Sequence, residues 1–354
     1  VEIIKPYLGG LMAKIKLRNS KYIGDYKKPY FVAEVNTSHF GDISKAKEMV
    51  LAAKESGADC VKFQSWSADT LYSDQYYKEN PIAKRFVKKF SLTNEELAEV
   101  ASYAESNQID FSSTPYSFEE AKFLVEKCKV PFVKIASMEL NNHVFLKQLA
   151  SLQVPLILST GMGSFEEIKS AVQLLKDESV KDLVILHCTS IYPSEPEIIN
   201  LKNITMLKKH FEHYAIGFSD HSEGLSVPTA AIALGACVIE KHFTLDKSQI
   251  GMDNGMATEP DEYRKMVDSC LTAYKSMGNE HRSLTSEEED MALKMRRSVV
   301  CKIDLQPGDL ITEDKIEFKR PGTGISVDSY MDIIGKEVNK PKLKGDLIYK
   351  NDIS

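Results

Sequence analysis

Short runs of apolar residues alternate with segments of helical periodicity eight times along this chain. Each run is apolar almost without interruption, as expected of strands that are buried on both faces. The eight runs cover residues 30–35, 60–63, 109–112, 132–135, 155–158, 183–186, 214–217 and 237–240. The segments between them carry apolar residues at helical spacing, for example 43–55, 94–105, 118–126 and 165–175. Eight strand–helix units of this size predict an α/β fold, the TIM (β/α)8 barrel.

Two helix starts carry a recognisable capping signal. Ser117 is followed three residues later by Glu120, and Thr93 is followed by Glu96. This spacing is typical of a capping box, in which each side chain binds the other residue's backbone N–H. We therefore expect helices to begin at residues 118 and 94.

The pattern changes near Arg297. A helix over 261–274 completes the barrel, and 283–295 is charged and helical enough to connect two domains. Beyond it, only short apolar runs and turns follow, which predicts a small, mostly β module. The predicted domains are an N-terminal extension and lead-in over 1–29, a barrel over 30–280, a linker over 281–296 and a β module over 297–354.

The composition is that of an ordinary globular protein, with 43% hydrophobic and 27% charged residues. No apolar stretch is long enough for a membrane span. A formal net charge of -6 argues against nucleic acid as a partner and favours small metabolites. The six cysteines are scattered, which favours reduced core residues and a cytoplasmic protein. The start lacks a secretory signal, and because Met12 precedes Ala13, we hypothesise that residues 1–11 are not native.

Polar residues cluster where the predicted strands end, which is where a TIM barrel carries its reactive groups. Two lysines, Lys62 and Lys134, lie among hydroxyl residues. Lysine and hydroxyl groups together suit a phosphate or carboxylate in a partly dry cavity. Buried positive charges also need anionic company, although either lysine alone could instead form a structural ion pair. The pattern thus favours an anion site.

Two histidines end consecutive predicted strands. His221 closes Gly217-Phe218-Ser219-Asp220-His221, and His242 closes Val238-Ile239-Glu240-Lys241-His242. Imidazole suits a divalent transition metal, and two such ligands leave positions open for water or a substrate carbonyl. Either histidine by itself could equally be a structural residue at a strand terminus.

A set of ordered motifs accompanies these residues. The motifs are Glu34 with His39-Phe40-Gly41, Val61-Lys62-Phe63-Gln64, Ser113-Thr114-Pro115-Tyr116, Lys134-Ile135-Ala136-Ser137, Leu158-Ser159-Thr160-Gly161-Met162, His187-Cys188-Thr189-Ser190-Ile191-Tyr192-Pro193, the two histidine motifs, and Lys319-Arg320-Pro321-Gly322. From about Tyr30 onward the chain resembles the sialic acid synthase family, and its tail resembles that family's antifreeze-like (SAF) domain.

The resemblance implies a transferase that condenses phosphoenolpyruvate with an N-acylated amino sugar and water, giving a nonulosonic acid and phosphate by C–O cleavage. A divalent metal, Mn²⁺ or Mg²⁺, held by His221 and His242, would polarise the sugar aldehyde. Together with Glu34, these histidines would be the catalytic residues. The resemblance assigns phosphoenolpyruvate to Lys62, Thr114, Lys134, Ser137, Ser190 and Ser219. It assigns the sugar to Gln64, Tyr116, Tyr192, Asp253 and Arg320.

The resemblance further implies a domain-swapped homodimer, in which the SAF domain caps the partner's barrel and Arg320 meets the sugar. Three departures from the family pattern leave the amino sugar open: Ser38-His39, Ser190 and Gly251-Met252-Asp253. Two alternatives also stay open. One is an aldolase that uses a lysine Schiff base, and the other is a non-enzymatic carbohydrate-binding protein.

Overall fold

The computed structural model describes residues 13–25, 27–278 and 281–354. The chain divides into two compact units, with the boundary between residues 278 and 279, and each unit is described by itself. The hypothesis about residues 1–11 lies outside the described residues.

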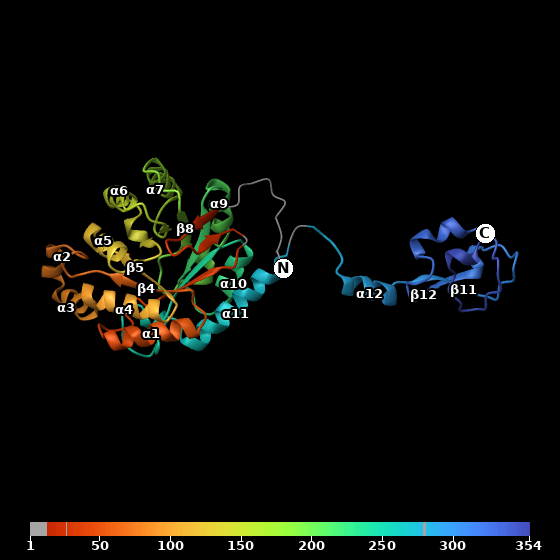
Figure 1. The fold of residues 1–354 in the computed structure, drawn as a ribbon, viewed down its shortest axis with the longest axis horizontal. Coiled ribbons are helices and arrows are strands. Elements are labelled where there is room, and N and C mark those ends of the chain that lie inside the picture. Colours follow the sequence, from red (N-terminus) through yellow and green to blue (C-terminus); the bar gives the residue numbers. More distant parts are fainter. Residues whose placement is uncertain (1–12, 26, 279–280) are drawn as a thin grey trace. The chain divides into compact units, whose positions relative to one another are not determined.

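The first unit is a ring of eight parallel strands surrounded by helices (Figure 1). The strands are β3 (Tyr30–Glu34), β4 (Cys60–Ser65), β5 (Asp110–Pro115), β6 (Val133–Ile135), β7 (Leu156–Ser159), β8 (Leu183–Cys188), β9 (Ala215–Asp220) and β10 (Val238–His242). Their order is β5-β4-β3-β10-β9-β8-β7-β6, and the hydroxyl of Ser112 donates to the Phe132 carbonyl at 3.0 Å across the remaining gap. The predicted TIM barrel is confirmed, with strands at all eight predicted runs.

Amphipathic helices cover the outside of the ring. They are α1 (Ile43–Glu55), α4 (Asn94–Ser106), α5 (Phe118–Glu126), α6 (His143–Ser151), α7 (Phe165–Asp177), α9 (Lys202–His210), α10 (Ser226–Ala233) and α11 (Pro260–Ser276). Three further helices lie in loops after strands: α2 (Asp74–Glu79), α3 (Pro81–Phe90) and α8 (Pro196–Ile199). Apolar residues of the helices and of the outward strand faces form one continuous core.

The two predicted helix starts differ in their caps. Thr93 and Glu96 form the complete capping box that begins α4. Ser117 accepts from the Glu120 N–H at the start of α5, but the Glu120 carboxylate accepts from the Tyr116 N–H at 2.8 Å. The second capping box is therefore only half present, because the carboxylate binds the residue before the cap.

A small hairpin precedes the barrel, where the sequence pattern predicts no strand. It pairs β1 (Lys14–Lys16) with β2 (Tyr22–Gly24). Its apolar side chains join those at the beginnings of the barrel strands in one buried cluster. Its backbone also donates to groups just before two strands, from Arg18 to the Pro131 carbonyl and from Lys16 to Asp182. The hairpin thus closes the amino-terminal end of the barrel.

The second unit begins with α12 (Ser286–Met295) and continues into a small β module. Strand β11 (Ser298–Cys301) pairs antiparallel with β12 (Ile316–Lys319), and the remainder is turns, short 3-10 segments and isolated bridges. Its own buried cluster includes Val299, Leu305 and Ile348. This confirms the predicted small, mostly β module. Among the described residues, we find no helix with the length and apolar character needed to cross a membrane.

Candidate active site

One cavity at the carboxyl ends of the barrel strands brings together most of the predicted site residues. Side chains alternate along a strand, so every second residue of the ring points inward. The predicted residues that line the cavity are Glu34, Lys62, Gln64, Thr114, Tyr116, Lys134, Ser137, Ser190, Tyr192, Ser219, His221 and His242. The sequence analysis did not assign the other six lining residues to the site: Ala136, Met138, Ser159, Met162, Cys188 and Glu240.

Lys62 forms the centre of the cavity's charge network. Its ammonium group contacts the Glu34 carboxylate, donates to the Thr114 hydroxyl at 2.9 Å and lies 3.7 Å from Glu240 Oε2. Burial alone would lower the pKa of Lys62, but Glu240 and Glu34 outweigh it and raise the pKa. Lys62 is therefore a buried, permanently charged cation.

Glu240 on β10 compensates both lysines across the inside of the ring. Its Oε1 lies 3.5 Å from Lys134 Nζ and accepts from the Ser219 hydroxyl at 3.0 Å. Burial would raise the pKa of Glu240, but Lys134 and Lys62 lower it to about 2. Burial lowers the pKa of Lys134, which donates to the Ser159 hydroxyl at 2.7 Å. A carboxylate within an otherwise apolar strand is the signal that could have found Glu240.

The Glu34 side of the cavity is a chain of hydrogen bonds. Glu34 Oε1 accepts from the Gln64 amide and from the Asn36 N–H, both at 3.1 Å, and Gln64 accepts from the Tyr116 hydroxyl at 2.9 Å. Burial raises the pKa of Glu34, with Lys62 opposing the shift. The other carboxylate oxygen, Glu34 Oε2, has an ion-pair contact with the Lys62 ammonium group and no further hydrogen-bond partner among the described residues. Both oxygens of this carboxyl group are thus held in place, one by hydrogen bonds and the other by Lys62.

The two histidines face each other across the ends of β9 and β10. Their ring centroids are 5.4 Å apart, and the Tyr192 ring lies 4.2 Å from that of His221. His221 Nδ1 donates to the Thr189 carbonyl at 2.7 Å, so Nε2 is the nitrogen that would coordinate when the ring is neutral. Burial would lower the pKa of His221, but Cys188 and the Thr189 carbonyl outweigh it and raise the pKa. Burial lowers the pKa of His242 well below its ordinary value, so this ring is neutral as a metal ligand must be.

These two imidazoles fit an open metal site and not a closed one. Within the described ranges, no group of three or more His, Cys, Asp and Glu side chains is arranged to hold an ion. Any metal there would take its other ligands from water and substrate, which is typical of catalytic sites. The donor set therefore suits a catalytic divalent ion bound by two protein nitrogens.

Asp253 and Arg320 lie outside the lining of this cavity. The Asp253 carboxylate accepts from the Asn36 side chain, and burial raises its pKa against the opposing charge of His221. Asp253 is therefore next to the histidine side of the site. Arg320 follows β12 in the second unit, so the barrel described by itself does not contain it.

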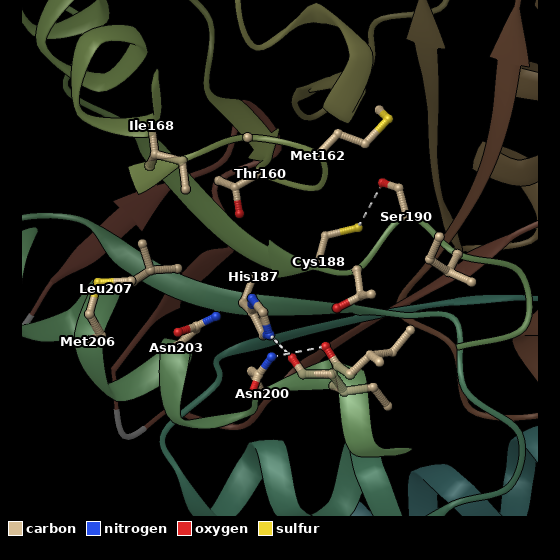
Figure 2. A pocket seen from close by; sticks show the side chains of 15 residues that line it. Thr160, Met162, Ile168, His187, Cys188, Ser190, Asn200, Asn203, Met206 and Leu207 are labelled. Carbon is tan, nitrogen blue, oxygen red and sulfur yellow. Dashed lines mark hydrogen bonds between the residues drawn. The ribbon is translucent and has the colours of Figure 1, made fainter. Parts of the chain in front are cut away.

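A second pocket adjoins the first and shares Met162, Cys188 and Ser190 with it. In Figure 2 the side chains of Cys188 and Ser190 point toward each other, 3.9 Å apart, on the side of β8 away from Asn203. His187 lines this second pocket and donates from Nε2 to the Ile199 carbonyl at 2.6 Å. No Asp, Glu, Lys or Arg side chain lines this pocket, and burial lowers the pKa of its histidine, His187. Of these two pockets, only the first is lined by lysine and glutamate side chains.

Comparison with known proteins places this cavity in context. The model of the NeuB family matches residues 49–282, and that of the SAF domain matches residues 296–354. The chain is 36% identical to the N,N'-diacetyllegionaminic acid synthase of Legionella pneumophila over 92% of this chain and 94% of that one. It is 30% identical to the human N-acetylneuraminate-9-phosphate synthase, over 92% of each. The crystal structure of the N-acetylneuraminic acid synthetase from Leptospira borgpetersenii, in complex with citrate, matches with a TM-score of 0.73 and 31% identity, over 79% of this chain and 95% of that one.

Proposed function

The chain belongs to the NeuB family and carries a SAF domain, and on this premise we propose that it condenses phosphoenolpyruvate with an N-acylated amino sugar and water. The products are a nonulosonic acid and phosphate, formed by C–O cleavage. The sugar is N-acetylmannosamine or a related diacetamido hexose. Relatives named as synthases of such acids support an enzyme of this general kind. The observation that carries the proposal is the buried pair of lysines beside hydroxyl groups in one cavity.

Phosphoenolpyruvate binds at the lysine side. Lys62 and Lys134 supply positive charge, and hydroxyl groups supply neutral donors at the wall of the same cavity. The proposed ligands are Lys62, Thr114, Lys134, Ser137, Ser190 and Ser219. Glu240 keeps both lysines compensated before the anion binds, so the empty cavity does not carry two unpaired charges.

The sugar binds toward the histidine side, with Gln64, Tyr116, Tyr192 and Asp253 around it. The enol carbon of phosphoenolpyruvate forms a bond to the aldehyde carbon, and the aldehyde oxygen takes up a proton. The raised pKa of Glu34 suits it to supply that proton. Water then adds at the cationic carbon that held the phosphate ester, and the phosphate leaves with the bridging oxygen.

His221 and His242 would hold Mn²⁺ or Mg²⁺. When bound, the metal supplies Lewis-acid polarisation of the aldehyde carbonyl. Tyr192 packs against both rings and excludes water from one side of them. The donor set and the fixed tautomer of His221 support this assignment.

We also propose a domain-swapped homodimer in which Arg320 of one copy reaches the sugar in the other copy's barrel. Arg320→Ala should then raise the KM for the sugar and leave the KM for phosphoenolpyruvate unchanged. A monomeric, fully active protein would contradict the swap.

A Schiff-base aldolase is a second candidate, because burial lowers the pKa of Lys134 and so favours a nucleophilic amine. It predicts a borohydride-trapped adduct with pyruvate and indifference to EDTA. The synthase predicts no adduct and an EDTA inhibition that Mn²⁺ reverses. If His221→Ala combined with His242→Ala left phosphate release unchanged, the synthase proposal would be wrong.

A further inference from the structure

A buried ion pair lies behind the two histidines, on the face of the ring that points away from the cavity. Ser219 and His221 line the cavity, as do Glu240 and His242, so the residue between each pair points outward. Those two residues are Asp220 and Lys241, which stand directly opposite each other in the β9–β10 pairing. Their side chains are 0% and 2% exposed, and Lys241 Nζ lies 2.5 Å from Asp220 Oδ2.

The same network also holds the residue that follows the first histidine. Lys241 Nζ donates to the Ser222 carbonyl at 2.6 Å. Asp220 Oδ1 accepts from the Ser222 N–H at 2.9 Å and from the Ser222 hydroxyl at 2.6 Å. His221 is therefore bracketed by two residues that bind Lys241, and Lys241 itself is bonded through the backbone to His242.

Hydrophobic burial alone does not account for this arrangement. A buried ion pair costs desolvation energy and adds little net stability compared with apolar residues of similar size. A network that fixes position can be retained for the geometry that it imposes. Here the imposed geometry is the separation and tilt of two rings at adjacent strand ends, with centroids 5.4 Å apart.

We propose that Lys241, with Asp220 and Ser222, is a positioning network that sets the spacing of His221 and His242 for metal binding. This inference rests on the metal assignment in the proposed function. Loss of an outer group that orients metal ligands lowers affinity by about 10- to 100-fold. Because the network does not line the cavity, its loss should leave the binding of phosphoenolpyruvate intact.

The test is to measure the Mn²⁺ dissociation constant of the full chain as wild type and as Lys241→Met. The matched control is Lys208→Met, which removes the barrel's ion pair with Asp25 near the opposite ends of the strands. We expect Mn²⁺ affinity to fall about 10- to 100-fold in Lys241→Met and less than about twofold in the control. Binding of phosphoenolpyruvate without metal should change less than about twofold in both, and added Mn²⁺ should restore activity to Lys241→Met.

Asp220→Asn is the second variant, because its amide oxygen can keep accepting from Ser222 while its NH2 group replaces the oxygen that binds Lys241. If Lys241→Met does not fold, the result with Asp220→Asn decides. If the wild type binds Mn²⁺ and these variants bind it with the same affinity, the inference is overturned and the proposed function stands. A wild type that binds no Mn²⁺ overturns the inference and the metal assignment together. If the variants bind Mn²⁺ more weakly but the wild type releases no phosphate from phosphoenolpyruvate, the positioning network is supported and the proposed synthase activity is contradicted.

Discussion

The two ends of the barrel are built from the same strands and differ in almost every chemical respect. At the amino-terminal end, β4 and β10 contribute Cys60 and Val238 to an apolar cluster that the hairpin covers. Two residues further along, the same strands contribute Lys62 and Glu240 to a buried charge network. The buried charge network thus lies at one end of the ring, where side chains from several strands compensate one another.

The comparison shows that the charged residues at the open end depend on one another, whereas the apolar residues at the closed end contribute separately. Each apolar residue at the closed end contributes its own burial, roughly in proportion to its area. At the open end, Lys62, Lys134, Glu34 and Glu240 compensate one another, so removal of one leaves another buried and unpaired. We therefore expect substitutions at the two ends to separate activity from stability.

The largest expected effect is that of Lys134→Met at the charged end. It removes a charge from the proposed phosphoenolpyruvate site and leaves Glu240 with one cation fewer. Losing one partner of a buried charge pair with a bound anion costs about 2–5 kcal/mol of binding energy, so kcat/KM for phosphoenolpyruvate should fall about 10³-fold. The measurement is the initial rate of phosphate release. Lys147→Met, which alters a lysine with a side chain 60% exposed, is the control and should stay near wild type.

Leu17→Ala tests the closed end. Leu17 is 1% exposed within the apolar cluster under the hairpin. We expect the free energy of unfolding in urea to fall by about 3 kcal/mol, because the truncation leaves a cavity. The KM for phosphoenolpyruvate should stay within about twofold. A large change in KM with little loss of stability would erase the distinction between the two ends.

The charged end should also make the fold sensitive to acid through His39, which follows β3. Burial lowers the pKa of His39 from 6.5 to about 4. Between those values the unfolded chain binds the proton and the folded chain does not, so stability falls as the pH falls. The expected loss is about 2 kcal/mol between neutral pH and pH 5, measured by urea unfolding. In His39→Gln this part of the pH dependence should vanish, and an unchanged slope would contradict the assignment.

The smallest expected effect is that of Ser219→Ala. It removes the hydroxyl that donates to Glu240 at 3.0 Å and that we assign to phosphoenolpyruvate. One neutral hydrogen bond contributes about 1 kcal/mol, so the dissociation constant for phosphoenolpyruvate should rise about fivefold. Calorimetric titration checks this, with thermal stability expected to stay close to that of the wild type. If Ser219→Ala weakened the binding of phosphoenolpyruvate as strongly as Lys134→Met is expected to, the charged and neutral side chains of the site would not differ in their contributions to binding.

The barrel could be predicted from sequence because strands buried on both faces are continuously apolar. Hairpin strands β1 and β2 were not predicted, because each has only three residues and, in β1, Lys14 and Lys16 flank a single apolar position. Nothing local distinguishes that segment from a loop. Its structure depends on contacts with strand ends far away in the sequence.

The candidate site was predictable to the extent that functional groups follow strand ends. Glu240 was missed as a site residue because a lysine search reveals the cations and not the partner that compensates them. The outward pair of Asp220 and Lys241 was also missed, because its significance lies in strand register. Asp253 was assigned from the family pattern, and only the fold shows that it lies next to the cavity, where it binds Asn36.

The measurement that tests the central claim most directly follows an isotope from phosphoenolpyruvate into the products. The protein is incubated with Mn²⁺, a panel of N-acyl hexosamines and diacetamido hexoses, and phosphoenolpyruvate labelled with ¹⁸O at the bridging oxygen. The account predicts an acid extended by three carbons from at least one sugar, with the label in the released phosphate. Absence of any extended acid across the panel, or release of phosphate without the label, would contradict it.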